Sequence, residues 1–143
     1  MSQKTVVHNL DGSITVIDTR TLEDAKAQAL AALAQTRWNA SLSCLYTVSG
    51  TAYTVPCDGD GQTNILGAVV GLQAAGSTGP ILWKFNGSVF VSLSLSDIIA
   101  MGQAVRAHIQ DCFDYEATLT AKINAAPDNA GVDAIDTSSG WPT

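Results

Sequence analysis

Histidine and cysteine are the residue types of this chain with the widest chemical repertoire, and the sequence holds two histidines and three cysteines. His108 and Cys112 are four residues apart, so both would lie on one face of a helix and could share a metal ion. Two ligands do not complete a structural metal site, and the sequence offers no second pair at a suitable spacing. Packing in a hydrophobic core is therefore the favoured role of Cys112, and we expect no metal ion or cofactor.

A second candidate for chemistry is the acidic segment Asp58-Gly59-Asp60-Gly61, which is similar to the beginning of a calcium-binding loop. The third ligand position of such a loop would hold Gln62, and no glutamate follows at the required distance. The segment is therefore predicted to be a plain turn that binds no cation.

Nucleophilic catalysis needs a base and a group that orients this base. The two histidines are His8, which lies in a predicted hairpin, and His108, which lies in a predicted helix. The sequence contains no G-x-S-x-G segment, no phosphate-binding P-loop and no dinucleotide-binding fingerprint. We assign no catalytic residue and expect that the protein is not an enzyme.

A hairpin is predicted over residues 42–56, with Ser49-Gly50 at its turn; Cys44 lies in its first strand and Cys57 directly follows its second strand. A four-residue loop would place Cys44 opposite Cys57, whereas a two-residue loop would place it opposite Val55. The sequence leaves both registers open, and with them a disulfide between the two cysteines. The odd number of cysteines fits a chain made in a reducing cytoplasm.

The distribution of charge excludes two classes of partner. The chain has 143 residues and a net charge of −6, and its seven basic residues are scattered along the sequence. Binding to nucleic acid or to an anionic membrane surface requires a basic patch, which this distribution does not provide. The most apolar window, residues 65–75, is far shorter than the roughly 18–20 residues that span a bilayer. We therefore expect neither nucleic acid nor a membrane as a partner.

The helices and strands that the sequence predicts around these residues indicate an α+β fold. It consists of two or three small β-hairpins packed with a short buried helix and two longer helices. The hairpins are expected at residues 5–18, 42–56 and 81–93, because β-branched and aromatic segments there flank turn residues such as Asn86-Gly87. Capping-box sequences predict that the two longer helices begin at Thr21 and Ser94.

The short helix is predicted over Asn64 to Ala75, and its sequence is apolar nearly all round, which is typical of a central, buried helix. Gly67 and Gly71 lie one turn apart in it and would let another backbone come close. The expected organisation is an N-terminal hairpin or arm over residues 1–19, an α+β domain over 20–126 and a C-terminal tail over 127–143.

The C-terminal helix is predicted to run from Ser94 to about Asn124, with a length of about 28 residues or about 42 Å. Its apolar residues recur in alternating steps of four and three, which is heptad spacing, and Gly102 and Glu116 interrupt it. This stripe either packs inside its own domain or pairs with another chain, and a homo-oligomer through this helix is one form of the second alternative. The residues predicted to bind a partner are Ile98, Val105, Ile109, Leu119, Ile123 and, in the tail, Trp141.

The tail is dominated by proline, glycine, aspartate and serine, and Trp141 is the exception. It is either a solvated terminus or a segment that Trp141 anchors on a surface, because a large aromatic side chain gains from burial.

The region around the long helix resembles a domain-of-unknown-function family found in tail proteins of tailed bacteriophages. The matching features are Trp83, the strand Val89 to Leu93, the helix start Leu95 to Asp97, Gly102, Val105, His108, Ile109, Cys112, Phe113 and Glu116-Ala117-Thr118-Leu119. The upstream helix, hairpin and short helix follow the usual order of the family, so the resemblance covers about Arg20 to Ala126. The hairpin with Cys44 and Cys57 departs from the family pattern.

The resemblance implies a non-enzymatic phage tail protein that binds the tail fibre or the baseplate as a structural component of the virion, after assembly in the host cytoplasm. The alternative that it implies is an assembly chaperone of the tail fibre that is absent from the mature virion.

Overall fold

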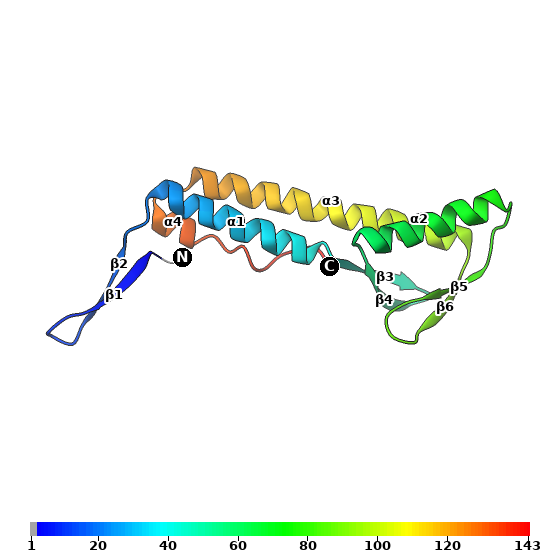
Figure 1. Ribbon diagram of the computed structural model, residues 1–143, viewed down its shortest axis with the longest axis horizontal. Coiled ribbons are helices and arrows are strands. Elements are labelled where there is room, and N and C mark those ends of the chain that lie inside the picture. Colours follow the sequence, from blue (N-terminus) through cyan, green and yellow to red (C-terminus); the bar gives the residue numbers. More distant parts are fainter. Residues whose placement is uncertain (1–2) are drawn as a thin grey trace.

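The computed structural model describes residues 3–143 and shows an elongated α+β protein (Figure 1). Its elements in chain order are β1 (Lys4–His8), β2 (Ile14–Asp18), α1 (Leu22–Ala40), β3 (Ser43–Val48), β4 (Thr51–Pro56), α2 (Gly59–Ala74), β5 (Ile81–Lys84), β6 (Phe90–Leu93), α3 (Leu95–Ala125) and α4 (Asn129–Asp133). The predicted fold class is confirmed, and the long C-terminal helix has 31 residues.

Helix α3 is the spine of the molecule, and two shorter helices pack along it one after the other (Figure 1). Helix α1 covers its C-terminal part, where Leu33 packs with Leu119 and Ile123. Helix α2 covers its N-terminal part, where Ile65 lies in one core cluster with Ile98. The apolar stripe of α3 is therefore divided between two partner helices of the same chain.

Both predicted capping boxes are present at the beginnings of α1 and α3. The Thr21 hydroxyl accepts a hydrogen bond from the Asp24 amide, and the Asp24 carboxylate accepts one from the Thr21 amide. Ser94 and Asp97 form the same pair at α3. These contacts satisfy amides that have no partner within the helix, which explains why both helices begin where the sequence predicted.

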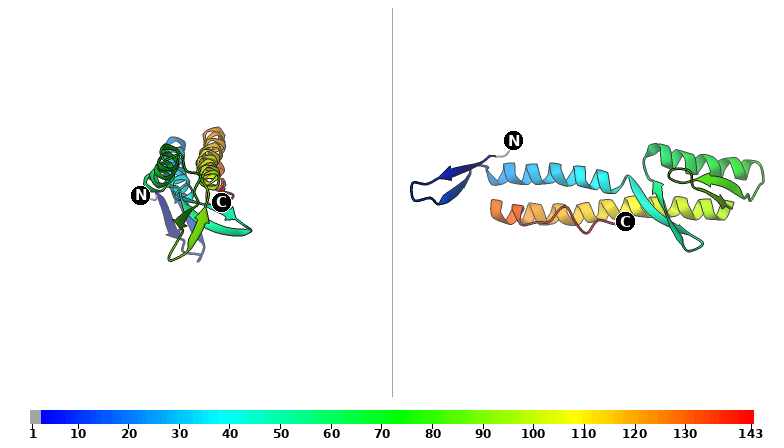
Figure 2. Two further views of the ribbon diagram at one scale, coloured as in Figure 1. Left: turned by 90° about the vertical axis from the view of Figure 1, so that its right-hand side faces the viewer. Right: turned by 90° about the horizontal axis from the view of Figure 1, so that it is seen from below.

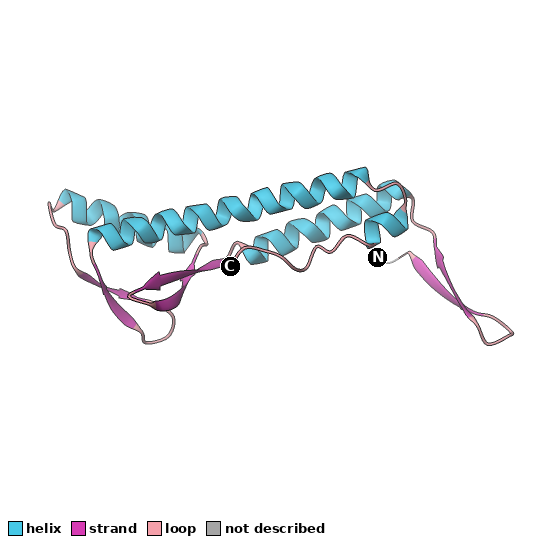
Figure 3. Cartoon of the chain, turned by 180° about the vertical axis from the view of Figure 1, so that it is seen from behind, coloured by secondary structure: helices cyan, strands magenta, loops and turns pink. Residues whose placement is uncertain are grey.

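The strands form three separate two-stranded antiparallel sheets, each of them a single hairpin. Seen end-on, the helices form one layer and the hairpins project from it (Figure 2). The second and third hairpins share a core with α2 and α3, in which the rings of Tyr53 and Phe85 stack with centroids 4.5 Å apart. The first hairpin lies beyond the end of the helical pair (Figure 3).

Helix α2 differs from the prediction in extent and in burial. It begins at Gly59, because the Asp58 side chain caps it by accepting a hydrogen bond from the Gly61 amide at 2.8 Å. The acidic segment is thus a helix start, and the prediction of a plain turn is wrong. The prediction of burial on all sides is also wrong, since Leu66 and Val70 are 62% and 53% exposed.

The segment after α3 returns along the helical pair and is not a free terminus (Figure 3). It forms the short helix α4, whose Val132 is buried against Ala25 and Ala126. Further on, the Trp141 ring packs edge-on against Tyr115 with centroids 4.9 Å apart, and its indole nitrogen donates a hydrogen bond to the Thr137 carbonyl. Trp141 therefore anchors the tail on its own chain.

Candidate functional site

The residues predicted to bind a partner lie inside the chain's own core. Ile98, Val105, Leu119 and Ile123 are buried, while Ile109 and Trp141 are half-buried. They face α1, α2 and the hairpins of the same chain. A partner could reach the four buried side chains only if the helices separated, so their partner-binding role stays a prediction.

His108 and Cys112 are brought together, as their spacing implies, with 3.7 Å between the Cys112 sulfur and the His108 Nε2. His108 is buried, and its Nε2 lies 2.8 Å from the Ala40 carbonyl, to which it must donate because a carbonyl only accepts. Its Nδ1 is buried without a hydrogen-bond partner. Among residues 3–143 no group of three or more His, Cys, Asp or Glu side chains is placed to hold a metal ion.

An apolar groove with a volume of about 360 Å³ lies between α2 and the N-terminal part of α3. Its lining consists of Gln62, Ile65, Leu66, Val69, Ile99, Gly102, Gln103, Val105 and Arg106. The exposed side chain of Val70 continues the outer face of α2. This groove, called the α2/α3 groove below, carries a single charged residue, Arg106, among its lining side chains.

Close packing of the two helices at the floor of the groove depends on Gly102. A Cβ atom at this position would lie 3.1 Å from the Ile65 side chain. Gly67 and Gly71, for which the sequence predicted a close backbone contact, have no atom from another element of the chain within 4 Å of where a Cβ would lie. Both therefore lie on the outer face of α2, where only another molecule could approach them.

The N-terminal hairpin offers a second apolar surface. The antiparallel register pairs Val6 with Val16 and His8 with Ile14, so these side chains share one face. Val6, Ile14 and Val16 are each more than half exposed. A single hairpin is marginally stable in water without something to pack on, so this face is incomplete as it stands.

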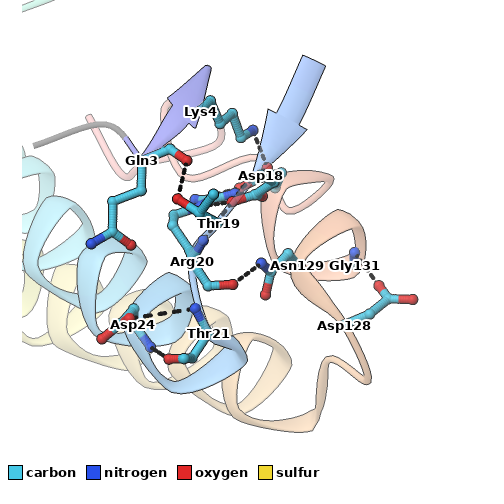
Figure 4. Close-up of polar contacts among 11 residues, drawn as sticks. Gln3, Lys4, Asp18, Thr19, Arg20, Thr21, Asp24, Asp128, Asn129 and Gly131 are labelled. Carbon is cyan, nitrogen blue, oxygen red and sulfur yellow. Dashed lines mark hydrogen bonds and ion pairs between the residues drawn. The ribbon is translucent and has the colours of Figure 1, made fainter. Parts of the chain in front are cut away.

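A cluster of ions fixes this hairpin to α4 (Figure 4). The Arg20 guanidinium contacts Asp18 at 2.6 Å and Asp133 at 2.8 Å, and Lys4 also pairs with Asp133. Hydrogen bonds and the positive charge of Arg20 hold the pKa of Asp18 and of Asp133 below their usual range. At neutral pH both carboxylates are therefore ionised, and the hairpin is held in place by the contacts of α4.

Sequence reasoning missed both exposed surfaces, although a signal for the groove was present. No charged residue occurs between Asp60 and Lys84, so α2 has no charged side chain after Asp60 that its outer face could present to solvent. An uncharged helix is expected to be buried. The chain covers only part of α2, and the uncovered part borders the groove.

None of the helices formed by residues 3–143 is long and apolar enough to cross a membrane.

The chain is a small α+β protein in which two helices pair with successive halves of a longer third helix. The chain belongs to the family described as domain of unknown function (DUF4376), whose family model matches residues 24–138. The match includes α2, α3 and α4 and leaves the N-terminal hairpin outside. Comparison with curated proteins gave no match, and neither did comparison with solved structures.

Proposed function

We propose that this protein is a non-enzymatic component of a bacteriophage tail and binds the tail fibre or the baseplate in the assembled virion. The phage-tail part of the proposal is supported by the resemblance of the segment from Trp83 to Leu119 to a family found in tail proteins. The binding part is supported by the surface of the molecule.

The surface area is the observation that supports binding most strongly. The chain exposes 8749 Å². A compact monomer of its mass, 14.9 kDa, would expose about 7,000 Å². The difference, about 1,700 Å², is about twice the roughly 800 Å² that each partner contributes to a standard protein–protein interface. A chain with this much additional surface is suited to a place in an assembly.

The proposed location of the binding site is supported by the apolar side chains in this surface. The α2/α3 groove and the exposed face of the N-terminal hairpin lie near opposite ends of the molecule (Figure 1). Leu66 and Val70 border the groove and project into solvent. Fully burying one such side chain stabilises a complex by about 1.5–3 kcal/mol. The groove is therefore the surface that we assign to the fibre or baseplate protein.

The test is co-purification of the tail-fibre and baseplate proteins with the chain after co-expression. The double variant Leu66→Asp, Val70→Asp is expected to weaken the association about tenfold or more, because two carboxylates would have to lose their water. Its melting temperature should stay close to that of the wild type, since both positions are exposed. Leu45→Asp is the matched control, because Leu45 is equally exposed but lies on β3, outside the groove. Retention of both partners at wild-type levels by the double variant would contradict this assignment.

A further inference from the structure

The two walls of the α2/α3 groove match each other in length. Each wall is one face of a helix, on which the lining residues recur at steps of three and four residues over two turns, or about 10 Å. The α2 wall consists of Gln62, Ile65, Leu66 and Val69, and the α3 wall of Ile99, Gly102, Gln103 and Arg106, with Val105 beside them. The groove is therefore long enough for two turns of a further helix.

The two ends of the groove differ in polarity. Helix α2 runs toward the end of the molecule at which α3 begins, so the two helices are antiparallel (Figures 1 and 2). They meet at the floor of the groove, where a Cβ at Gly102 would lie 3.1 Å from the Ile65 side chain. One turn from this contact, Gln62 and Arg106 lie together at one end of the groove. In the other direction, Val69 makes the end apolar.

The walls offer few hydrogen bonds to a segment that enters the groove. Both walls are helices, whose amides and carbonyls are bonded within the helix. The Gln62 side-chain amide already donates to the Cys57 carbonyl at 2.9 Å, and Gln103 is the other uncharged polar side chain of the lining. An extended segment would lose its hydrogen bonds to water here, whereas a helix satisfies its own backbone. The lining therefore favours a helix as the occupant.

Arg106 determines which charge the occupant carries. Lys4, Arg20 and Arg37 each contact a carboxylate of the chain. Arg106 is exposed, and among residues 3–143 it forms no ion pair. A carboxylate of the occupant would complement this guanidinium, whereas a second cation would be repelled.

We infer that the α2/α3 groove holds an amphipathic helix with two aliphatic side chains one turn apart and an acidic side chain one turn further along. The aliphatic pair packs along Val69 and Leu66, over Gly102, and the carboxylate pairs with Arg106. The inference rests on the proposed function for the protein that supplies this helix, namely the tail-fibre or baseplate protein. The chemistry of the occupant rests on the groove alone.

The experiment titrates the folded chain with a blocked peptide of about 15 residues, a length at which an isolated alanine-rich helix begins to form. The peptide consists of alanine and glutamine, with two leucines four residues apart and a glutamate three residues after the second leucine. Amide NMR spectra are expected to show saturable shifts in residues 62–69 and 99–106, which line the groove. A peptide with a central proline is expected to bind at least about tenfold more weakly, because proline disrupts the helix.

Charge reversal tests the acidic contact separately from the apolar one. Arg106→Glu is expected to weaken binding of the glutamate peptide about five- to tenfold and to strengthen binding of a peptide with lysine in place of the glutamate. Lys122→Glu is the matched control, because Lys122 is exposed on the same helix but outside the groove. Leu66→Asp should weaken binding of both peptides, and Leu45→Asp should leave both unchanged. Circular dichroism checks that each variant is folded.

Three results would overturn the inference. One is the absence of shifts along the groove with the glutamate peptide, and another is equal binding of the proline peptide, which would indicate an extended occupant. The third is equal affinity of the wild type for the glutamate and lysine peptides. The proposed function fails separately: peptide binding as described, without co-purification of a fibre or baseplate protein, would support the inference and contradict the proposed partner.

Discussion

At the scale of single residues, the glycines of α2 show how position in the fold decides the role of a residue. Gly61 lies where the helix begins, and a Cβ there would overlap the Pro56 carbonyl group, whose carbon would be only 2.8 Å away. Gly67 faces open space. The sequence suggested close packing at Gly67 and placed Gly61 in a turn, whereas the close contact is found at Gly61.

This difference predicts opposite effects of the same substitution. Gly61→Ala should lower the free energy of unfolding by about 1–3 kcal/mol, because the new methyl group meets backbone that cannot give way easily. Gly67→Ala should raise it by about 0.5–1 kcal/mol, because alanine favours the helix and nothing in the chain opposes its methyl group. Urea denaturation of the two variants measures both. Equal stability of Gly61→Ala and the wild type would show that α2 does not pack on the end of β4 as described.

Local signals in the sequence determine much of the fold, and they explain what could be predicted. The capping boxes at Thr21 and Ser94 fixed two helix starts, and Asn86-Gly87 lies in the connection between β5 and β6. The cysteine register could not be predicted, because the turn length at Ser49-Gly50 decides it and both lengths fit the sequence. For the groove, the sequence shows that α2 is uncharged, but it does not show which part of this helix its own chain leaves uncovered.

At the scale of elements, the N-terminal hairpin is the part that depends most on a few contacts. Its strands bury no large side chain, and its attachment rests on Lys4, Arg20 and the α4 residue Asp133. Arg20 is the central member, with a side chain that is only 8% exposed. Exposed ion pairs contribute little singly, but here one guanidinium joins two carboxylates on different elements.

Arg20→Ala should therefore release the hairpin without unfolding the rest. Amide hydrogen exchange of residues 4–18 should become faster, while protection in α3 stays as in the wild type. High salt should produce a weaker form of the same effect, because it screens the ion pairs. Arg106→Ala, at the rim of the α2/α3 groove, is the control of equal charge and should leave the hairpin unchanged. Unchanged exchange in Arg20→Ala would mean that the ion cluster does not hold the hairpin.

At the scale of the whole molecule, the proposed function rests on the length of the molecule and on its uncovered apolar surface. The helical pair is extended, and the three hairpins remain separate two-stranded sheets that do not merge into one. This arrangement leaves a groove near one end and an apolar hairpin near the other (Figure 1). A molecule of this shape can contact a partner along its length or join two neighbours, which suits a component of a larger assembly.

The most direct test of the proposed function is quantitative mass spectrometry of purified phage particles from a lysate in which this chain is produced. A structural tail component is expected in the particles at a fixed number of copies relative to the tail-fibre or baseplate protein, and it should remain after washing at high salt. Particles that contain the fibre but none of this chain, with the chain left in the lysate, would contradict the structural role and favour an assembly chaperone.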